Sequence, residues 1–370
     1  MAHLDVSTPV GPAGDVDLAG DLVALTQTIC DIPSVSGAED ALADAVERAL
    51  RRYPHLRVTR SGNAVVATTQ TGADQRIILA GHLDTVPISA EPNLPTRLSE
   101  GVLWGRGSVD MKGGVAVALR LAATLDRPAK DVTYVFYDNE EVESAKNGLG
   151  RLARTDPDLL RGDFAVLLEP TNAIIEGGCK GTLRVEVVTR GVAAHSARPW
   201  AGQNAIHAAS RILEVLTTYP ARTVDVDGLA YHEALQAVGV RGGVAGNVIP
   251  DECVVTVNYR FAPDRDEDAA LAHVREVFAG FEVRVVDLAG GARPGLDRPV
   301  AQDFVAALGL PVTAKEGWTD VARFAGLGIP AVNFGPGDPM LAHRDDEQCP
   351  TEQIRAVEEA LLRWLTPRTR

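Results

Sequence analysis

The sequence predicts an α/β fold in two domains, and three observations support this. The chain has 370 residues, more than one hydrophobic core usually serves. Short apolar segments alternate with segments of helical periodicity, which is typical of a largely parallel sheet covered by helices. Between about residues 181 and 290, apolar and polar residues alternate within the strands instead, as in an antiparallel sheet with one exposed face.

The flanking parts of the chain predict the layers of the larger domain. The apolar spacing from Asp21 to Arg52 is helical and is interrupted by D-I-P-S-V-S-G at 31–37, so a break between helices is expected there. Another helix is expected over Gly114–Leu125. The expected strands are short and apolar, and they are Ala64–Thr68, Arg76–Ala80, Val132–Tyr137, Phe164–Leu168 and Ala331–Phe334.

The middle of the chain predicts a smaller inserted domain. Strands are expected at 182–190, near 233–240, at 253–261 and at 281–288, and helices at 204–219 and 266–279. The order β-α-β-β-α-β is that of a ferredoxin-like α+β domain. We therefore expect one domain made of residues 1–180 and 291–370, and an insert of residues 181–290.

The composition limits the partners and the location. A formal net charge of −14 argues against nucleic acid or an anionic membrane surface as the partner. The sequence has no apolar run long enough to span a bilayer, and its first twenty residues lack the features of a secretory signal. The four cysteines are dispersed, which favours buried thiols over a disulfide framework. The expected location is the cytoplasm.

Acidic residues and histidines follow the expected strands of the larger domain. In open α/β sheets, ligands bind beyond the carboxyl ends of the strands, so these side chains should converge at one edge. Asp110 lies in the glycine-rich run at 105–114, which lacks the residue order of a phosphate-binding loop. The converging residues are His82, Asp84, Asp110, Asp138, Glu140, Glu141, Glu169 and His343.

Imidazole and carboxylate groups together suit Zn²⁺, which takes about four ligands. Carboxylates packed without a cation would repel one another and take up protons. Two divalent ions about 3.5–4 Å apart, joined by a bridging carboxylate, would resolve this conflict. A further glutamate could then act as a general base. Taken singly, the same residues could be ordinary turn and helix-start residues, so the residues alone leave both interpretations open.

Seven collinear motifs resemble the co-catalytic zinc amidohydrolases related to aminoacylases, acetylornithine deacetylases and carboxypeptidases. They are G-H-L-D-T-V-P (81–87), G-R-G-S-V-D-M-K-G-G (105–114), Y-D-N-E-E-V (137–142), L-L-E-P-T (167–171), G-V-A-A-H-S-A-R-P (191–199), G-N-V-I-P (246–250) and H-R-D-D-E (343–347). The resemblance implies a zinc-peptidase-like α/β catalytic domain, an inserted ferredoxin-like dimerisation (lid) domain, and a homodimer that acts on a small N-acyl amino acid.

The resemblance also implies a set of metal ligands. His82 and Glu169 would bind one Zn²⁺, and Glu141 and His343 would bind the other. Asp110 would bridge the two ions. Co²⁺ or Mn²⁺ is the alternative in one of the two sites.

The remaining implied roles are catalytic and substrate-binding. Asp84 would orient His82, as carboxylates behind metal-bound histidines commonly do. Glu140 would be the general base and then the general acid. His195 of the insert would stabilise the oxyanion in the active site of the partner subunit. The implied substrate contacts are Arg198, Asn247, Arg260 and Arg323.

Within this family the chain is most similar to the actinobacterial succinyl-diaminopimelate desuccinylases. The segments that carry this similarity are Y-D-N-E-E-V-E-S-A-K-N-G-L-G, C-K-G-T-L-R-V, A-G-N-V-I-P, N-Y-R-F-A-P-D-R, G-W-T-D-V-A-R-F and N-F-G-P-G-D-P. The implied reaction is hydrolysis of N-succinyl-LL-2,6-diaminopimelate in the biosynthesis of diaminopimelate and lysine.

The loop W-T-D-V-A-R at 318–323 differs from the T-S-D-G-R type of loop found in proteobacterial desuccinylases, which leaves the acyl specificity open. The alternatives are an acetylornithine deacetylase and a metallo-dipeptidase or carboxypeptidase of the same family. A metal-binding scaffold without catalysis is disfavoured, because every ligand position and the base position are filled.

Overall fold

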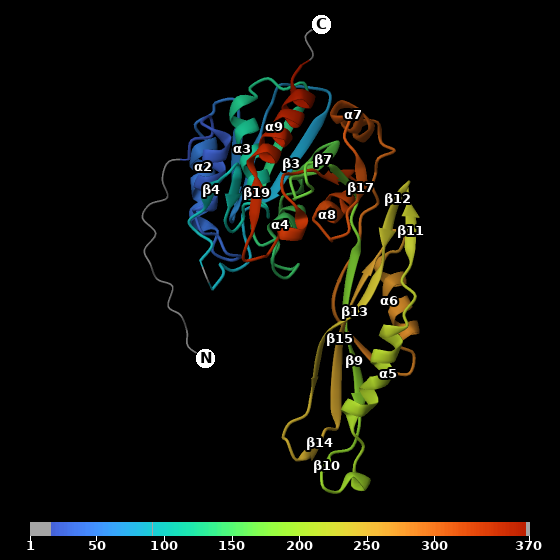
Figure 1. Ribbon diagram of the computed structural model, residues 1–370. Helices are drawn as coiled ribbons and strands as arrows, with labels where there is room; N and C mark the ends of the chain where they lie inside the picture. Colours follow the sequence, from blue (N-terminus) through green and yellow to red (C-terminus); the bar gives the residue numbers. More distant parts are fainter. Residues whose placement is uncertain (1–15, 91, 368–370) are drawn as a thin grey trace. The chain divides into compact units, whose positions relative to one another are not determined.

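The computed structural model describes residues 16–90 and 92–367. The expectation of no secretory signal concerns the first twenty residues, and residues 1–15 of these lie outside the described residues. The chain divides into two compact units (Figure 1). The first unit comprises residues 1–176, 297–312 and 326–370, and the second comprises residues 177–296 and 313–325. The insert expected at 181–290 falls within the second unit, which also takes in a second stretch of chain.

A mixed sheet forms the centre of the first unit. Its order among the described residues is β1-β2-β6-β3-β7-β18-β8-β17. The strands β6, β3, β7 and β18 run parallel, and their side chains are almost entirely buried, as expected for strands covered on both faces. The bounds are β1 Arg57–Ser61, β2 Ala64–Thr68, β3 Arg76–His82, β6 Asp131–Tyr137, β7 Phe164–Leu167, β8 Ile175–Gly177, β17 Val312–Ala314 and β18 Ala331–Asn333.

Helices and a small ribbon complete the first unit. Helix α3 packs against β3, α1 and α9, and Gly114 lets it lie directly on the chain that follows β7, because a Cβ there would lie 2.1 Å from the carbonyl oxygen of Leu168. The helices are α1 Leu22–Cys30, α2 Asp40–Leu50, α3 Lys112–Thr124, α4 Gly148–Thr155, α7 Pro299–Leu308 and α9 Thr351–Leu365. The ribbon has the order β19-β5-β4, with β4 Arg97–Ser99, β5 Val102–Trp104 and β19 Gln348–Pro350.

The second unit confirms the ferredoxin-like prediction. Its main sheet has the order β13-β15-β9-β16 with antiparallel neighbours, and helices α5 and α6 pack against one face (Figure 1). The elements are β9 Gly181–Arg190, α5 Ala205–Thr217, β13 Ala234–Gly242, β15 Glu252–Phe261, α6 Glu267–Val277 and β16 Glu282–Ala289, and helix α8 spans Val321–Gly326.

Two short antiparallel pairs in the second unit were not expected. They are β10 (Ala194–His195) with β14 (Val248–Ile249), and β11 (Thr223–Val226) with β12 (Leu229–His232). Runs of two to four residues are too short for the alternation of side chains to indicate a strand.

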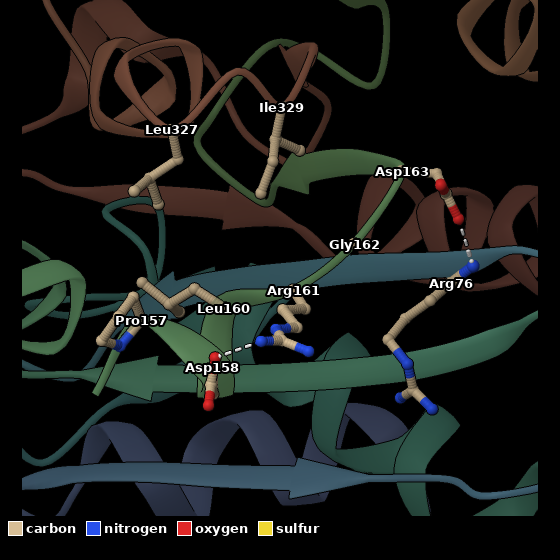
Figure 2. Close-up of a pocket in the computed structure, with 9 residues that line it drawn as sticks. All are labelled: Arg76, Pro157, Asp158, Leu160, Arg161, Gly162, Asp163, Leu327 and Ile329. Atoms are coloured by element: carbon tan, nitrogen blue, oxygen red, sulfur yellow. Dashed lines mark hydrogen bonds and ion pairs between the residues drawn. The ribbon is translucent and has the colours of Figure 1, made fainter.

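A cavity of about 580 Å³ opens at the end of the central sheet where strand β3 begins (Figure 2). Arg76, the first residue of β3, and the chain leading into β7 line it. Arg161 forms an ion pair with Asp158 at 2.6 Å in its wall. The cavity therefore lies at the amino ends of the parallel strands, and the residues that follow β3, β6 and β7 lie at the carboxyl ends.

The structure also bears on the cysteines and on the membrane. Cys30, Cys179, Cys253 and Cys349 are all buried free thiols, as the sequence predicts. Over the described residues, the helices are too short or too polar to cross a bilayer.

Candidate active site and metal centre

The first unit brings the predicted metal ligands together. His82 is the last residue of β3, Glu140 and Glu141 follow β6, and Glu169 follows β7. Three groups of side chains among the described residues have ligand atoms within 4.8 Å of one another and could hold a metal ion. They are His82 with Asp110 and Glu169, Asp110 with Glu141 and His343, and His82 with Glu140 and Glu141.

Asp110 lies between the two histidines. Its Oδ1 is 3.0 Å from Nε2 of His82, and its Oδ2 is 3.3 Å from Nε2 of His343. Each oxygen of one carboxylate thus faces a different imidazole. This arrangement would allow one carboxylate to offer one oxygen to each of two ions.

His343 reaches the site from a different part of the chain. Its Nε2 is 2.9 Å from Oε2 of Glu141, and its side chain is half-exposed. Its backbone has a φ of 66°, in the left-handed region that non-glycine residues adopt infrequently. The loop around His343 must therefore be held by its surroundings.

Asp84 is completely buried and organises the backbone of the site. Its carboxylate accepts hydrogen bonds from the backbone N–H groups of Glu140 (3.0 Å) and Glu141 (3.1 Å) and from Oγ of Ser36 (2.7 Å). Nδ1 of His82 lies 3.0 Å from the carbonyl oxygen of Asp84 and 3.5 Å from its Oδ1. Asp84 thus connects the end of β3 to the segment that carries the two adjacent glutamates.

The carboxylates and imidazoles of the site lie close enough to shift one another's pKa values. Burial and the charge of Asp110 raise the pKa of Glu141. Hydrogen bonds to Asp110 and Glu141 raise the pKa of His343 to about 10. Burial alone would lower the pKa of His82, but its hydrogen bond to Asp110 and the nearby carboxylates raise it well above the usual range. A cation would relieve this crowding, and the imidazole and carboxylate donors suit Zn²⁺.

Three of the predicted residues in the second unit lie together. His195 in β10 pairs with Val248 of β14, and the N–H of Ser196 donates to the carbonyl oxygen of Asn247 at 2.9 Å. The N–H of Arg198 donates to the carbonyl oxygen of His195 at 2.8 Å. His195, Arg198 and Asn247 therefore share one end of this unit, where the His195 side chain is exposed.

The other two predicted residues lie at the opposite end of the same sheet. Arg260 pairs with Thr182 near the start of β9, whereas Glu252 pairs with Arg190 at its end. From Glu252 to Arg260 the strand spans roughly 27 Å at about 3.4 Å per residue. Arg323 pairs with Asp320 and lies 5.4 Å from the ring centre of Trp318, whose Nε1 donates to Gly290 beyond β16. Within one chain the structure does not bring Arg260 and His195 together.

Two residues beside the site, Arg106 and Glu347, were not predicted from the sequence. Both lie within the quoted motifs and both are buried, at 3% and 1% exposure. An isolated charged residue in a loop or an acidic run usually indicates a solvated surface. One signal could have revealed them. Arg106 and Glu347 carry opposite charges, and they lie in the same two motifs as Asp110 and His343.

Comparison with known proteins identifies the family. The model of peptidase family M20/M25/M40 matches residues 78–366. A Mycobacterium tuberculosis protein, provisionally named a succinyl-diaminopimelate desuccinylase, is 54% identical over 95% of this chain and 99% of the relative. The succinyl-diaminopimelate desuccinylase of Corynebacterium glutamicum is 47% identical over 95% of this chain and 98% of the relative.

Solved structures share the fold at low sequence identity. A tripeptidase from Staphylococcus aureus superposes with a TM-score of 0.77 at 20% identity, covering 95% of this chain and 98% of that chain. A Bacillus subtilis protein described as a dinuclear metal-binding peptidase of the M20 family gives a TM-score of 0.69 at 17% identity, covering 93% and 96%. With the extensive family match and the two close relatives, the chain belongs to peptidase family M20/M25/M40.

Proposed function

We propose that the protein hydrolyses N-succinyl-LL-2,6-diaminopimelate to succinate and LL-2,6-diaminopimelate. The observation that carries the hydrolytic chemistry is the Asp110 carboxylate between His82 and His343, with Glu140 and Glu141 in the same cluster. The choice of substrate rests on the names of the mycobacterial and corynebacterial relatives, which share about half of their residues with this chain over nearly its whole length. We assign the protein to the cytoplasm, because its buried free thiols suit a reducing compartment.

The proposed cofactor is a pair of Zn²⁺ ions, with Co²⁺ or Mn²⁺ as the alternative in one site. His82, Asp110 and Glu169 would hold one ion, and Asp110, Glu141 and His343 would hold the other. When bound, zinc supplies a Lewis acid that polarises the amide carbonyl and makes water a better nucleophile near neutral pH.

Glu140 is the proposed proton carrier. Its carboxylate takes a proton from the attacking water, whose oxygen forms a bond to the succinyl carbonyl carbon. The C–N bond then breaks, and Glu140 returns the proton to the leaving amine. The backbone N–H of Glu140 is fixed on the Asp84 carboxylate, which keeps this segment next to His82.

Arginine side chains are the proposed recognition elements for the substrate. N-Succinyl-LL-2,6-diaminopimelate carries several carboxylates, and a planar guanidinium can bind a carboxylate through two parallel hydrogen bonds. Arg198, Arg260 and Arg323 are the candidates, with Asn247 as a further polar contact. Burial and the nearby Arg184 lower the pKa of Arg260, so an anionic partner would stabilise its charge.

A homodimer is part of the proposal. Strand β13 is the edge of its sheet, and it exposes Val238 (60%) and Val240 (59%), which favours pairing with another strand. Trp200 and Val244, beyond the same end of the unit as His195, are also strongly exposed. His195 lies in the short β10–β14 pair at one end of the unit and Arg260 near the other end of the main sheet, which supports a site that takes these two residues from two chains.

Subunit mixing tests the shared site. His195→Ala and Glu140→Gln variants should each be inactive, and mixed dimers should regain part of the wild-type turnover, because one of the two sites then has both residues intact. Turnover is measured after subunit exchange, which a mass or affinity tag verifies. His207→Ala, which changes a histidine on α5 of the same unit, is the matched control and should retain activity. Exchange without recovered turnover contradicts the shared site.

A substrate panel tests the proposed reaction. With added Zn²⁺, kcat/KM for N-succinyl-LL-2,6-diaminopimelate should exceed that for N-acetylornithine and for dipeptides by at least about 100-fold, since a missing charged contact costs several kcal/mol. Faster turnover of N-acetylornithine or of a dipeptide would identify the protein as a deacetylase or a dipeptidase instead.

A further inference from the structure

A buried ion pair lies directly behind the two loops that carry Asp110 and His343. Nη1 of Arg106 donates to Oε2 of Glu347 at 2.8 Å, and both side chains are almost completely buried. The other carboxylate oxygen, Oε1 of Glu347, accepts hydrogen bonds from the backbone N–H groups of Val109 (3.0 Å) and Asp110 (3.2 Å). Glu347 therefore holds the backbone on which the Asp110 side chain is mounted.

The same pair also holds the loop of His343. Nη1 of Arg106 donates a second hydrogen bond, at 3.1 Å, to the carbonyl oxygen of Arg344, the residue after His343. The N–H of Gly105 donates to the carbonyl oxygen of Glu347 at 2.9 Å. These bonds hold the chain just after His343, whose left-handed backbone conformation needs support from its surroundings.

Strand pairing explains why these distant residues meet. Gln348 of β19 is paired with Trp104 of β5, so the residues just beyond each strand, Glu347 and Gly105, face each other. Arg106 then follows immediately. Two segments more than 200 residues apart in sequence are thus joined at the point where each leads into a predicted metal ligand.

We infer that Arg106 and Glu347 are positioning residues that set the separation between Asp110 and His343 and thereby the affinity of the metal site these ligands share. The inference rests on the ligand set of the proposed function. Neither side chain is assigned contact with substrate or metal. Their effect passes through the backbone of Val109, Asp110 and Arg344. Residues that orient metal ligands in this way commonly change metal affinity by about 10–100-fold when they are replaced.

Metal titration of Glu347 variants tests the inference. Metal-free protein is titrated with Zn²⁺ against a chromophoric chelator, which reports two dissociation constants without any activity measurement. Glu347→Met removes both acceptor oxygens, and Glu347→Gln keeps one of them but loses the charge that faces Arg106. We expect the site of Asp110, Glu141 and His343 to lose about 10–100-fold in zinc affinity in Glu347→Met, so that at least one of the two dissociation constants rises, with a smaller rise in Glu347→Gln.

Asp346→Asn provides the matched control, because it removes a carboxylate from the neighbouring position. That carboxylate pairs with Arg344 on the surface, where both side chains are more than half exposed. Its metal dissociation constants should equal those of the wild type. Thermal unfolding of each metal-free variant separates a loss of stability from a loss of metal affinity. If Glu347→Met does not fold, Glu347→Gln and Arg106→Gln carry the test.

The outcomes distinguish this inference from the proposed function. Weaker zinc binding at one or both sites in the Glu347 variants, with Asp346→Asn unchanged, supports the positioning role. Wild-type protein that binds two zinc ions, together with folded Glu347 and Arg106 variants that bind both equally well, overturns the inference alone. Wild-type protein that binds no zinc overturns the proposed function and this inference with it.

Discussion

Replacing Glu140 by glutamine is expected to lower kcat/KM by about 10³-fold or more while the metal ions stay bound. Glutamine has nearly the same shape but cannot take a proton from water, so the loss reports the proton-transfer role. The structure makes metal content an essential part of this measurement, because the Glu140 carboxylate belongs to a group with His82 and Glu141 that could itself hold an ion. Turnover and bound metal per chain should be measured on the same preparation.

Glu143→Gln is the matched control for this substitution. Glu143 lies on the same segment, but it is exposed and pairs with Lys146 at 2.9 Å. Its variant should keep wild-type turnover. Near-wild-type activity in Glu140→Gln with full metal content would mean that another group moves the proton. Loss of metal together with activity would mean that Glu140 is a ligand.

Removing the metal is expected to lower the rate of hydrolysis by about 10³-fold or more while the protein stays folded. The metal ligands lie at strand ends and in loops, whereas the cores of both units are built from buried apolar side chains that do not depend on a cation. A chelator should therefore eliminate turnover without changing the far-ultraviolet circular dichroism spectrum. Added Zn²⁺ should restore activity in proportion to the metal bound.

The same chelator saturated beforehand with Zn²⁺ is the control, because it can inhibit only by binding the protein and not by removing metal. Full turnover in protein shown to be metal-free would refute metal-dependent hydrolysis. Unfolding upon chelation would instead assign the ions a structural role, which the scaffold alternative also includes.

The convergence of the candidate metal ligands could be predicted because these residues follow regular strands. His82 ends a continuous apolar strand, and Glu141 and Glu169 follow two others, so the parallel sheet itself implies that they meet. Glu347 could not be recognised in this way. It is the last residue of H-R-D-D-E, and its burial depends on the pairing of β19 with β5, two strands of three residues each.

The strands of the fold could also be predicted where they are continuous apolar runs in the sequence. Strand β2 was expected at its observed bounds, Ala64–Thr68, because four of its five residues are apolar, and the structure buries these four. The membership of residues 313–325 in the second unit was not predictable, because it depends on contacts distant in sequence. Lys180 pairs with Glu316 at 2.5 Å, and Nε1 of Trp318 donates to the carbonyl oxygen of Gly290 at 3.0 Å.

This two-segment unit has a consequence for building chimeras between relatives. If residues 177–296 alone were replaced by those of a relative, Glu316 and Trp318 of this chain would face the relative's residues in place of Lys180 and Gly290. The loop that differs from the proteobacterial enzymes, residues 318–323, would also stay behind with the recipient. The second unit can therefore be exchanged with its internal contacts intact only when both of its segments, residues 177–296 and 313–325, are transferred together.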